Sequence, residues 1–86
     1  PEILKSEINF NLKHSKFYAE LGINAKNQAG LMAYVMGVFK EFNIKIVSAK
    51  VQTIKDRTRN LFLIQKGGAL DSNYKKIVNL LINKGE

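Results

Sequence analysis

The residues best placed to bind a ligand lie in a short run at positions 25–32, AKNQAGLM, where a strand pattern ends and a helix pattern begins. The side-chain amides of Asn27 and Gln28 can each donate and accept hydrogen bonds. Gly30 stands at the junction itself, where the first turn of a helix leaves backbone N–H groups unpaired for an anion or a carbonyl. The sequence therefore predicts a ligand site at this junction.

The same residues also have a purely structural interpretation. Asparagine is a favoured N-cap and tolerates unusual backbone angles, so Asn27 and Gln28 can serve as a helix cap and a turn. Gly30 can serve close packing alone. The residue types by themselves leave both interpretations open.

No other group of side chains predicts chemistry. The 86 residues contain no cysteine and one histidine, which excludes disulfides and thiolate metal sites. His14 lies in a polar turn and the carboxylates are scattered, so a nucleophile, a base and an orienting group cannot be assembled. We therefore expect no catalytic site, no metal and no cofactor in this chain.

Length and composition predict one small domain over residues 1–86, with enough apolar residues for a core. No apolar run approaches the length of a membrane span, and the N-terminus lacks the order of a signal peptide. We expect a cytoplasmic protein with no membrane contact. Because the chain opens at Pro1 and not at methionine, we expect a fragment of a longer polypeptide.

The formal net charge of +7 raises the question of a nucleic-acid partner. The lysines and arginines are spread over a turn, a strand, a loop and the last helix, which is typical of a solvated surface. We therefore expect no nucleic-acid partner.

Two alternating runs at the N-terminus predict a hairpin with a four-residue polar loop at positions 13–16. The first run is Ile8–Leu12 and the second is Phe17–Ala25. The residues expected on the buried face of the second strand are Phe17, Ala19, Leu21, Ile23 and Ala25.

Apolar spacings of three and four predict two helices. The first runs over Leu31–Phe42, with a buried stripe of Leu31, Tyr34, Val35, Val38, Phe39 and Phe42. The second follows Gly67-Gly68, with Asp71 or Ser72 as its N-cap and a stripe of Leu70, Tyr74, Ile77, Val78 and Leu81.

Two further strands are expected between the helices. The alternation changes phase between Ile46 and Val47, which predicts a loop or a bulge before the strand proper. Lys55–Arg59 is expected to be a polar connection, and Asn60–Lys66 a strand covered on both faces. No strand is expected over the polar residues 83–86. The element order ββαββα predicts an α+β fold with two helices on one face of a four-stranded antiparallel sheet.

Three motifs in this order resemble the ACT domain, a small regulatory module that binds amino acids and related effectors. Its usual pattern is DRPGLL at the start of a helix, then GxNIxxAxIxT and DxFxV on two strands. The matching residues are Gly30, Leu31 and Met32, then Ile46, Ala49, Val51 and Thr53, and then Phe62 and Ile64. The run from Ser48 to Phe62 is most similar to the C-terminal ACT domain of bacterial PII uridylyltransferase/uridylyl-removing enzymes.

The resemblance implies a ferredoxin-like sandwich. The usual ACT order is βαββαβ, and here the extra strand at Ile8–Leu12 would take the place of the missing last strand, which makes the order a permuted one. It also implies an amino-acid effector, with glutamine as the expected one. The partners implied are a second ACT domain and the catalytic domains of a parent chain, a uridylyltransferase and a phosphohydrolase.

The resemblance places the effector between one domain and the second strand of a paired ACT domain. The residues implied are Asn27, Gln28, Ala29, Gly30 and Leu31 on one side and Ile46, Val47 and Ser48 on the other. The chain departs from the family at positions 27–29, where Asp, Arg and Pro are usual. An asparagine at the first of these positions is similar to the serine-sensing ACT domains of 3-phosphoglycerate dehydrogenase, where an amide touches the ligand.

Two alternatives stand beside the sensing domain. A structural ACT domain would pair or dock without a ligand, and four apolar residues on the open sheet face, Tyr18, Ile54, Leu61 and Leu63, favour a partner domain or a second copy. An RNA-binding module of the RRM type shares the layout, but it stacks bases on several aromatics of its central strands. The corresponding strand here, Arg59–Gln65, has only Phe62.

The RNA alternative gives the first prediction. We expect short single-stranded RNAs to bind weakly and without base preference, because the chain supplies charge but no stacking platform. Fluorescence titration at physiological salt measures this. Submicromolar binding with a clear base preference would contradict it.

Overall fold

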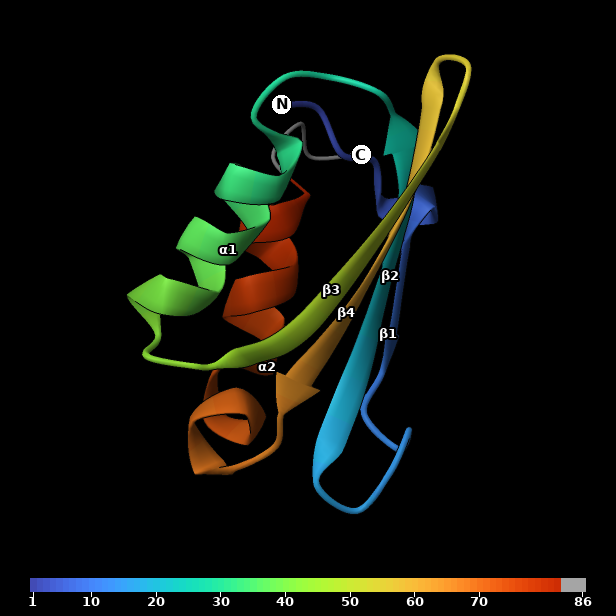
Figure 1. Cartoon of the computed structure of the whole chain (residues 1–86). Coiled ribbons are helices and arrows are strands. Elements are labelled where there is room, and N and C mark those ends of the chain that lie inside the picture. The colour runs from blue at the N-terminus through green and yellow to red at the C-terminus, as the bar shows by residue number, and fades with distance from the viewer. Residues whose placement is uncertain (83–86) are drawn as a thin grey trace.

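The computed structural model describes residues 1–82, in which two helices pack on one face of a four-stranded antiparallel sheet (Figure 1). The elements are β1 (Ile8–Asn11), β2 (Tyr18–Lys26), α1 (Leu31–Glu41), β3 (Ile46–Ile54), β4 (Arg57–Gln65) and α2 (Gly68–Leu81). A short 3-10 turn, Lys5–Glu7, precedes β1. The strand order is β1-β2-β4-β3, so the predicted α+β, ferredoxin-like class is confirmed, and this strand order fits an ACT-like fold.

The centre of the sheet is the antiparallel pair of β2 and β4, which are nine residues each. Alternate residues of both strands are buried against the helices, as the period of a strand requires. The buried residues are Ala19, Leu21, Ile23 and Ala25 on β2 and Thr58, Asn60, Phe62 and Ile64 on β4. The four inward positions predicted from Ala19 to Ala25 are therefore confirmed.

The two helices supply the other half of the core. Helix α1 buries Leu31, Val35, Val38 and Phe39, and α2 buries Leu70, Ile77 and Leu81. Tyr34, Phe42, Tyr74 and Val78 of the predicted stripes are half-buried. The predicted extent of α1 is confirmed to within one residue, with Phe42 as its C-cap.

The predicted N-terminal hairpin is confirmed, since β1 pairs antiparallel with β2 from Ile8 opposite Ile23 to Asn11 opposite Glu20. Its loop is longer than the four residues predicted, because β1 ends at Asn11 and β2 begins at Tyr18. Phe10 joins β1 to the core, with its ring 6.1 Å from that of Phe39 and 5.2 Å from that of Tyr74.

The inward position predicted for Phe17 is wrong, because its side chain is 64% exposed. Phe17 precedes the first residue of β2, in the loop of the hairpin, and is not part of the hydrophobic core. Its backbone carbonyl still accepts a hydrogen bond from the N–H of Lys66, at 2.9 Å. The apolar alternation of the sequence therefore begins at Phe17, before the first buried residue of β2, Ala19.

The predicted phase change at the start of β3 is confirmed as an irregularity between Ile46 and Ser48. The predicted connection over Lys55–Arg59 is wrong, because strand pairing continues as far as Ile54 opposite Arg57. Only Lys55 and Asp56 form the turn, and Lys55 adopts a φ of 57° to make it. The polar side chains suggested a loop, but the backbone at the end of β3 and at the start of β4 is paired.

Two further expectations need correction. Helix α2 begins at Gly68 with Gly67 as N-cap, so neither Asp71 nor Ser72 caps it. β4 is covered on one face only, because Leu61 remains 37% exposed on the face away from the helices. The expectation for residues 83–86 lies outside the described residues. None of the helices in the described part of the chain has the length and apolar character to cross a lipid bilayer.

The contrast between Phe10 and Phe17 gives a second prediction. Phe10→Ala should lower the free energy of unfolding by about 2 kcal/mol, below the ~3–5 kcal/mol of a fully buried phenylalanine, because its ring is half-buried. Phe17→Ala is the matched control and should change it by less than about 0.5 kcal/mol. Urea denaturation measures both, and equal effects would contradict the positions of the two rings.

Candidate functional site

The candidate loop joins the end of β2 at Lys26 to the start of α1 at Leu31. Gly30 is the N-cap of α1 and has a left-handed backbone, with φ 79° and ψ 4°. Its carbonyl accepts the N–H of Tyr34 at 2.9 Å, which closes the first turn. As glycine has no side chain to cap the helix, the N–H groups of that turn are left for water or a ligand.

Asn27 is held by its backbone and exposes its side chain. Its N–H donates to the carbonyl of Asp56 at 2.6 Å, so the loop lies against the turn between β3 and β4. Its side-chain amide makes no hydrogen bond to any residue of the described part of the chain. The amide is therefore at the surface beside the N-terminus of α1, where the ligand site was predicted.

Gln28 is engaged within the chain. Its Oε1 accepts the N–H of Glu2 at 2.6 Å, and its Nε2 donates to the carbonyl of Glu2 at 2.7 Å. The same Nε2 donates to the carbonyl of Lys26 at 3.1 Å. Both ends of the Gln28 amide are thus occupied by the backbone, although Gln28 does not cap the helix, as its structural interpretation had it.

The remaining loop residues divide between surface and core. Ala29 is exposed next to Gly30, whereas the Leu31 side chain is 4% exposed and belongs to the core. Leu31 can therefore offer a ligand only its backbone N–H.

Ile46, Val47 and Ser48 lie at the other end of α1 from the loop (Figure 1). With eleven residues in α1, that separation is about 16 Å. The single chain thus brings residues 27–31 together but does not bring them to residues 46–48. Val47 lies in the irregular segment of β3 and is 42% exposed.

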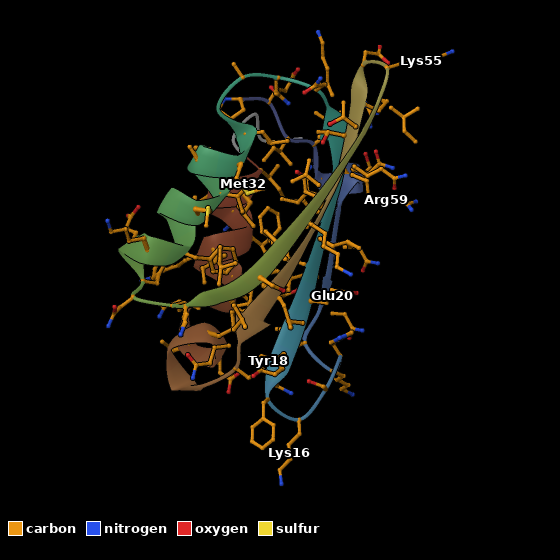
Figure 2. The ribbon with its side chains drawn as sticks, viewed as in Figure 1. Lys16, Tyr18, Glu20, Met32, Lys55 and Arg59 are labelled. Carbon is orange, nitrogen blue, oxygen red and sulfur yellow. The ribbon has the colours of Figure 1, made fainter. Side chains whose placement is uncertain are left out.

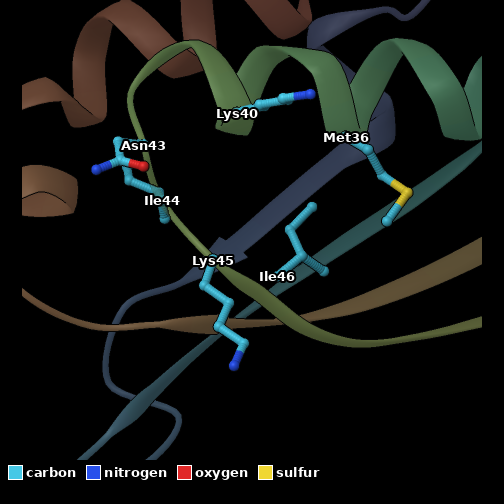
Figure 3. A pocket seen from close by; sticks show the side chains of 6 residues that line it. All are labelled: Met36, Lys40, Asn43, Ile44, Lys45 and Ile46. Atoms are coloured by element: carbon cyan, nitrogen blue, oxygen red, sulfur yellow. The ribbon is translucent and has the colours of Figure 1, made fainter.

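A cavity of about 310 Å³ opens beside Ile46, between the end of α1 and the start of β3 (Figure 3). Its lining combines apolar side chains with two lysines: Met36, Ile44 and Ile46 with Lys40, Lys45 and Asn43. The volume is at the lower end of the ~300–1,000 Å³ typical of ligand pockets.

The open face of the sheet carries both charge and apolar area. Arg59 and Glu20 project from it, on the side opposite to Met32 of α1 (Figure 2). Of the four apolar residues predicted there, Ile54 is 61% exposed, Leu61 is 37% exposed, and Tyr18 and Leu63 are half-buried. Phe62, the aromatic of the strand that would stack bases in an RRM, is 1% exposed in the core.

The sequence patterns missed three residues that hold the candidate loop: Glu2, Asp56 and Arg57. Arg57 Nη2 donates to Glu7 Oε2 at 3.1 Å and to the carbonyl of Asn24 at 2.9 Å. These partners are 50 and 33 residues away in the chain, so no local pattern could have identified them. Among residues 1–82 there is also no cluster of three His, Cys, Asp or Glu residues that could hold a metal ion.

No model of a known protein family matches the chain. Individual relatives do match, and they share one name, the bifunctional uridylyltransferase/uridylyl-removing enzyme. That of Haemophilus influenzae strain PittEE is 30% identical over 77 residues, which cover 87% of this chain and 9% of the relative. That of Nitrosospira multiformis is 27% identical over 77 residues, 90% of this chain and 8% of the relative.

The corresponding enzyme of Pasteurella multocida is 30% identical over 61 residues, which cover 71% of this chain and 7% of the relative. The chain therefore spans less than a tenth of the length of these curated relatives, 9% at most. It is similar to one short part of a much longer enzyme.

The backbone of Gly30 gives a third prediction. A Cβ at this position would meet no atom within 4 Å, so Gly30→Ala should cost only the strain of the left-handed backbone, about 1–2 kcal/mol of unfolding free energy. Gly37→Ala is the matched control, because its Cβ is equally unobstructed but lies inside α1, where it should stabilise by about 0.5–1 kcal/mol. Thermal unfolding measures both variants. If the two substitutions shift the unfolding temperature in the same direction, the left-handed φ of Gly30 is contradicted.

Proposed function

We propose that the chain is an ACT-like regulatory domain that binds an amino acid, glutamine first among the candidates, between two paired copies of the domain. The parent is a larger enzyme related to the uridylyltransferase/uridylyl-removing enzymes. The observation that carries the proposal is the position of the candidate loop beside the C-terminal end of β3, fixed by the bond from Asn27 to Asp56.

β3 is an edge strand of the sheet, no other strand of residues 1–82 pairs with its outer side, and every residue from Val47 to Ile54 is exposed. Val51 is 53% exposed, although it lies on the helix-facing side of the sheet, opposite the buried Asn60. An edge of this length offers unpaired backbone N–H and C=O groups to another strand. A second copy supplies such a strand.

Antiparallel pairing of two β3 strands explains how the two halves of the candidate site meet. In such a pair, the C-terminal end of one strand lies beside the N-terminal end of the other. The loop 27–30 adjoins the C-terminal end of its own β3, so it would adjoin Ile46–Ser48 of the partner. The residues that one chain keeps at opposite ends of α1 would then line one site.

The chemistry at this site suits a free amino acid. The unpaired N–H groups after Gly30 favour the α-carboxylate, since the N-terminus of a helix attracts negative charge. The exposed Asn27 amide can accept from the α-ammonium group or bond the carboxylate. The cavity beside Ile46 would hold the side chain, with Lys40 and Lys45 at its rim.

The effector and the pairing give a fourth prediction. In calorimetry against a panel of amino acids, glutamine should bind the chain, and Asn27→Ala should weaken binding about 5–10-fold by removing one hydrogen bond. Gly30→Val should abolish binding. Asn79→Ala, at an exposed position on α2, is the matched control and should bind glutamine as tightly as the unsubstituted chain does.

Pairing is tested in the same material by analytical ultracentrifugation. Val51→Asp, at an exposed position of β3, should yield a monomer that folds normally and binds no amino acid. If the chain dimerises but no amino acid gives heat or thermal stabilisation, the structural ACT domain without a ligand is the function that remains. If the Val51→Asp monomer still binds, the site does not span two copies.

A further inference from the structure

The N-terminal segment of residues 1–7, here called the strap, is docked onto the domain. Ile3 is 0% exposed and is part of the hydrophobic core. The strap is folded on itself at Glu7, whose N–H donates to the carbonyl of Leu4 at 2.9 Å and whose Oε1 accepts the N–H of Leu4 at 2.9 Å. The segment is therefore an ordered part of the structure.

The first end of the strap is tied to the candidate loop. The Gln28 amide bonds both the N–H and the carbonyl of Glu2, as a neighbouring strand backbone would. An amide suits this role because it carries a donor and an acceptor side by side, whereas an ionised carboxylate can only accept. Gln28 stands two residues before Gly30, in the segment predicted to bind the effector.

The second end is tied to the β3–β4 turn. Glu7, with a side chain only 12% exposed, pairs with Arg57 at 3.1 Å, and Arg57 also bonds the carbonyl of Asn24. Asp56, the neighbour of Arg57, accepts the N–H of Asn27. The contacts thus form a closed ring from loop to turn to strap and back to the loop.

From this ring we infer that strap docking and effector binding at the loop stabilise each other, with Gln28, Glu7 and Arg57 as positioning residues that do not contact the effector. A ring of this kind links the position of the loop to that of the strap, since neither can move without breaking a bond to the other. Any segment of a parent chain that precedes the strap would then respond to occupancy of the site. This coupling rests on the proposed function for its ligand, but the ring itself can be tested without one.

The ligand-free test uses amide hydrogen exchange of the 86-residue chain. The Leu4 N–H reports on the strap and the Asn27 N–H on the loop, because each is hydrogen-bonded. Glu7→Ala should accelerate exchange at both amides at least about 5-fold, although it removes no bond of Asn27. Glu41→Ala, an exposed glutamate at the end of α1, is the control and should change neither.

Gln28→Ala cuts the ring at its other side and should accelerate exchange of the Leu4 N–H, whereas Gln52→Ala on the open face of β3 should not. Faster exchange at Leu4 with an unchanged rate at Asn27 in Glu7→Ala would overturn the coupling, because the strap would then open alone. Unchanged exchange at both amides would overturn it as well, since the Glu7 contacts would then hold neither element.

The ligand test uses glutamine as the probe. Because binding coupling is reciprocal, glutamine should slow exchange of the Leu4 N–H, and Glu7→Ala should weaken glutamine binding by the same factor, at least about 5-fold. If the unsubstituted 86-residue chain and Glu7→Ala bind glutamine with equal affinity, the coupling is overturned and the proposed function stays intact. If the unsubstituted chain does not bind glutamine, the proposed function is contradicted. Amide hydrogen exchange without ligand would still decide whether the ring acts as a unit.

Discussion

The register between β2 and β4 determines both the core and the candidate site. Lys26 pairs with Arg57 at one end of this ladder and Tyr18 with Gln65 at the other. A slip of one residue would turn Leu21 and the other inward side chains to solvent, so the apolar alternation fixes the register. The same register places the residue after β2, Asn27, against the carbonyl of Asp56. The position of the loop is thus a consequence of how the core is packed.

The sequence predicted what depends on periodicity and failed where partners are distant. The alternation from Ala19 to Ala25 identified the buried face, but it could not show that the core ends before Phe17, because that limit depends on where the helices stop. The polar residues Lys55–Arg59 gave a false loop, since backbone pairing satisfies a strand whatever its side chains. The bond between Gln28 and Glu2 joins residues 26 positions apart, for which no local pattern exists.

The helices cover the sheet unequally, and this asymmetry leaves one edge available. On β3 only Ile46 is even half-buried, so the strand is held to the domain almost entirely by its ladder to β4. Scattered exposed apolar residues need no explanation in a soluble domain. A full nine-residue edge strand with Val47, Val51 and Ile54 exposed is a different case, because it combines apolar area with unpaired backbone groups.

The polar groups around the start of α1 could either bind a ligand or serve a structural role, and the residue types alone left both uses open. A serine or an aspartate at the N-cap would satisfy the first turn of the helix from its own side chain and would compete with a ligand for those N–H groups. Gly30 cannot do so, and the left-handed backbone it adopts explains why a residue with a Cβ would be strained there. The amide of Gln28 is hydrogen-bonded to the strap, whereas the amide of Asn27 is exposed beside the uncapped turn. Recognition at this loop therefore falls to one side chain and the backbone, while the second amide connects the loop to the segment that enters the domain.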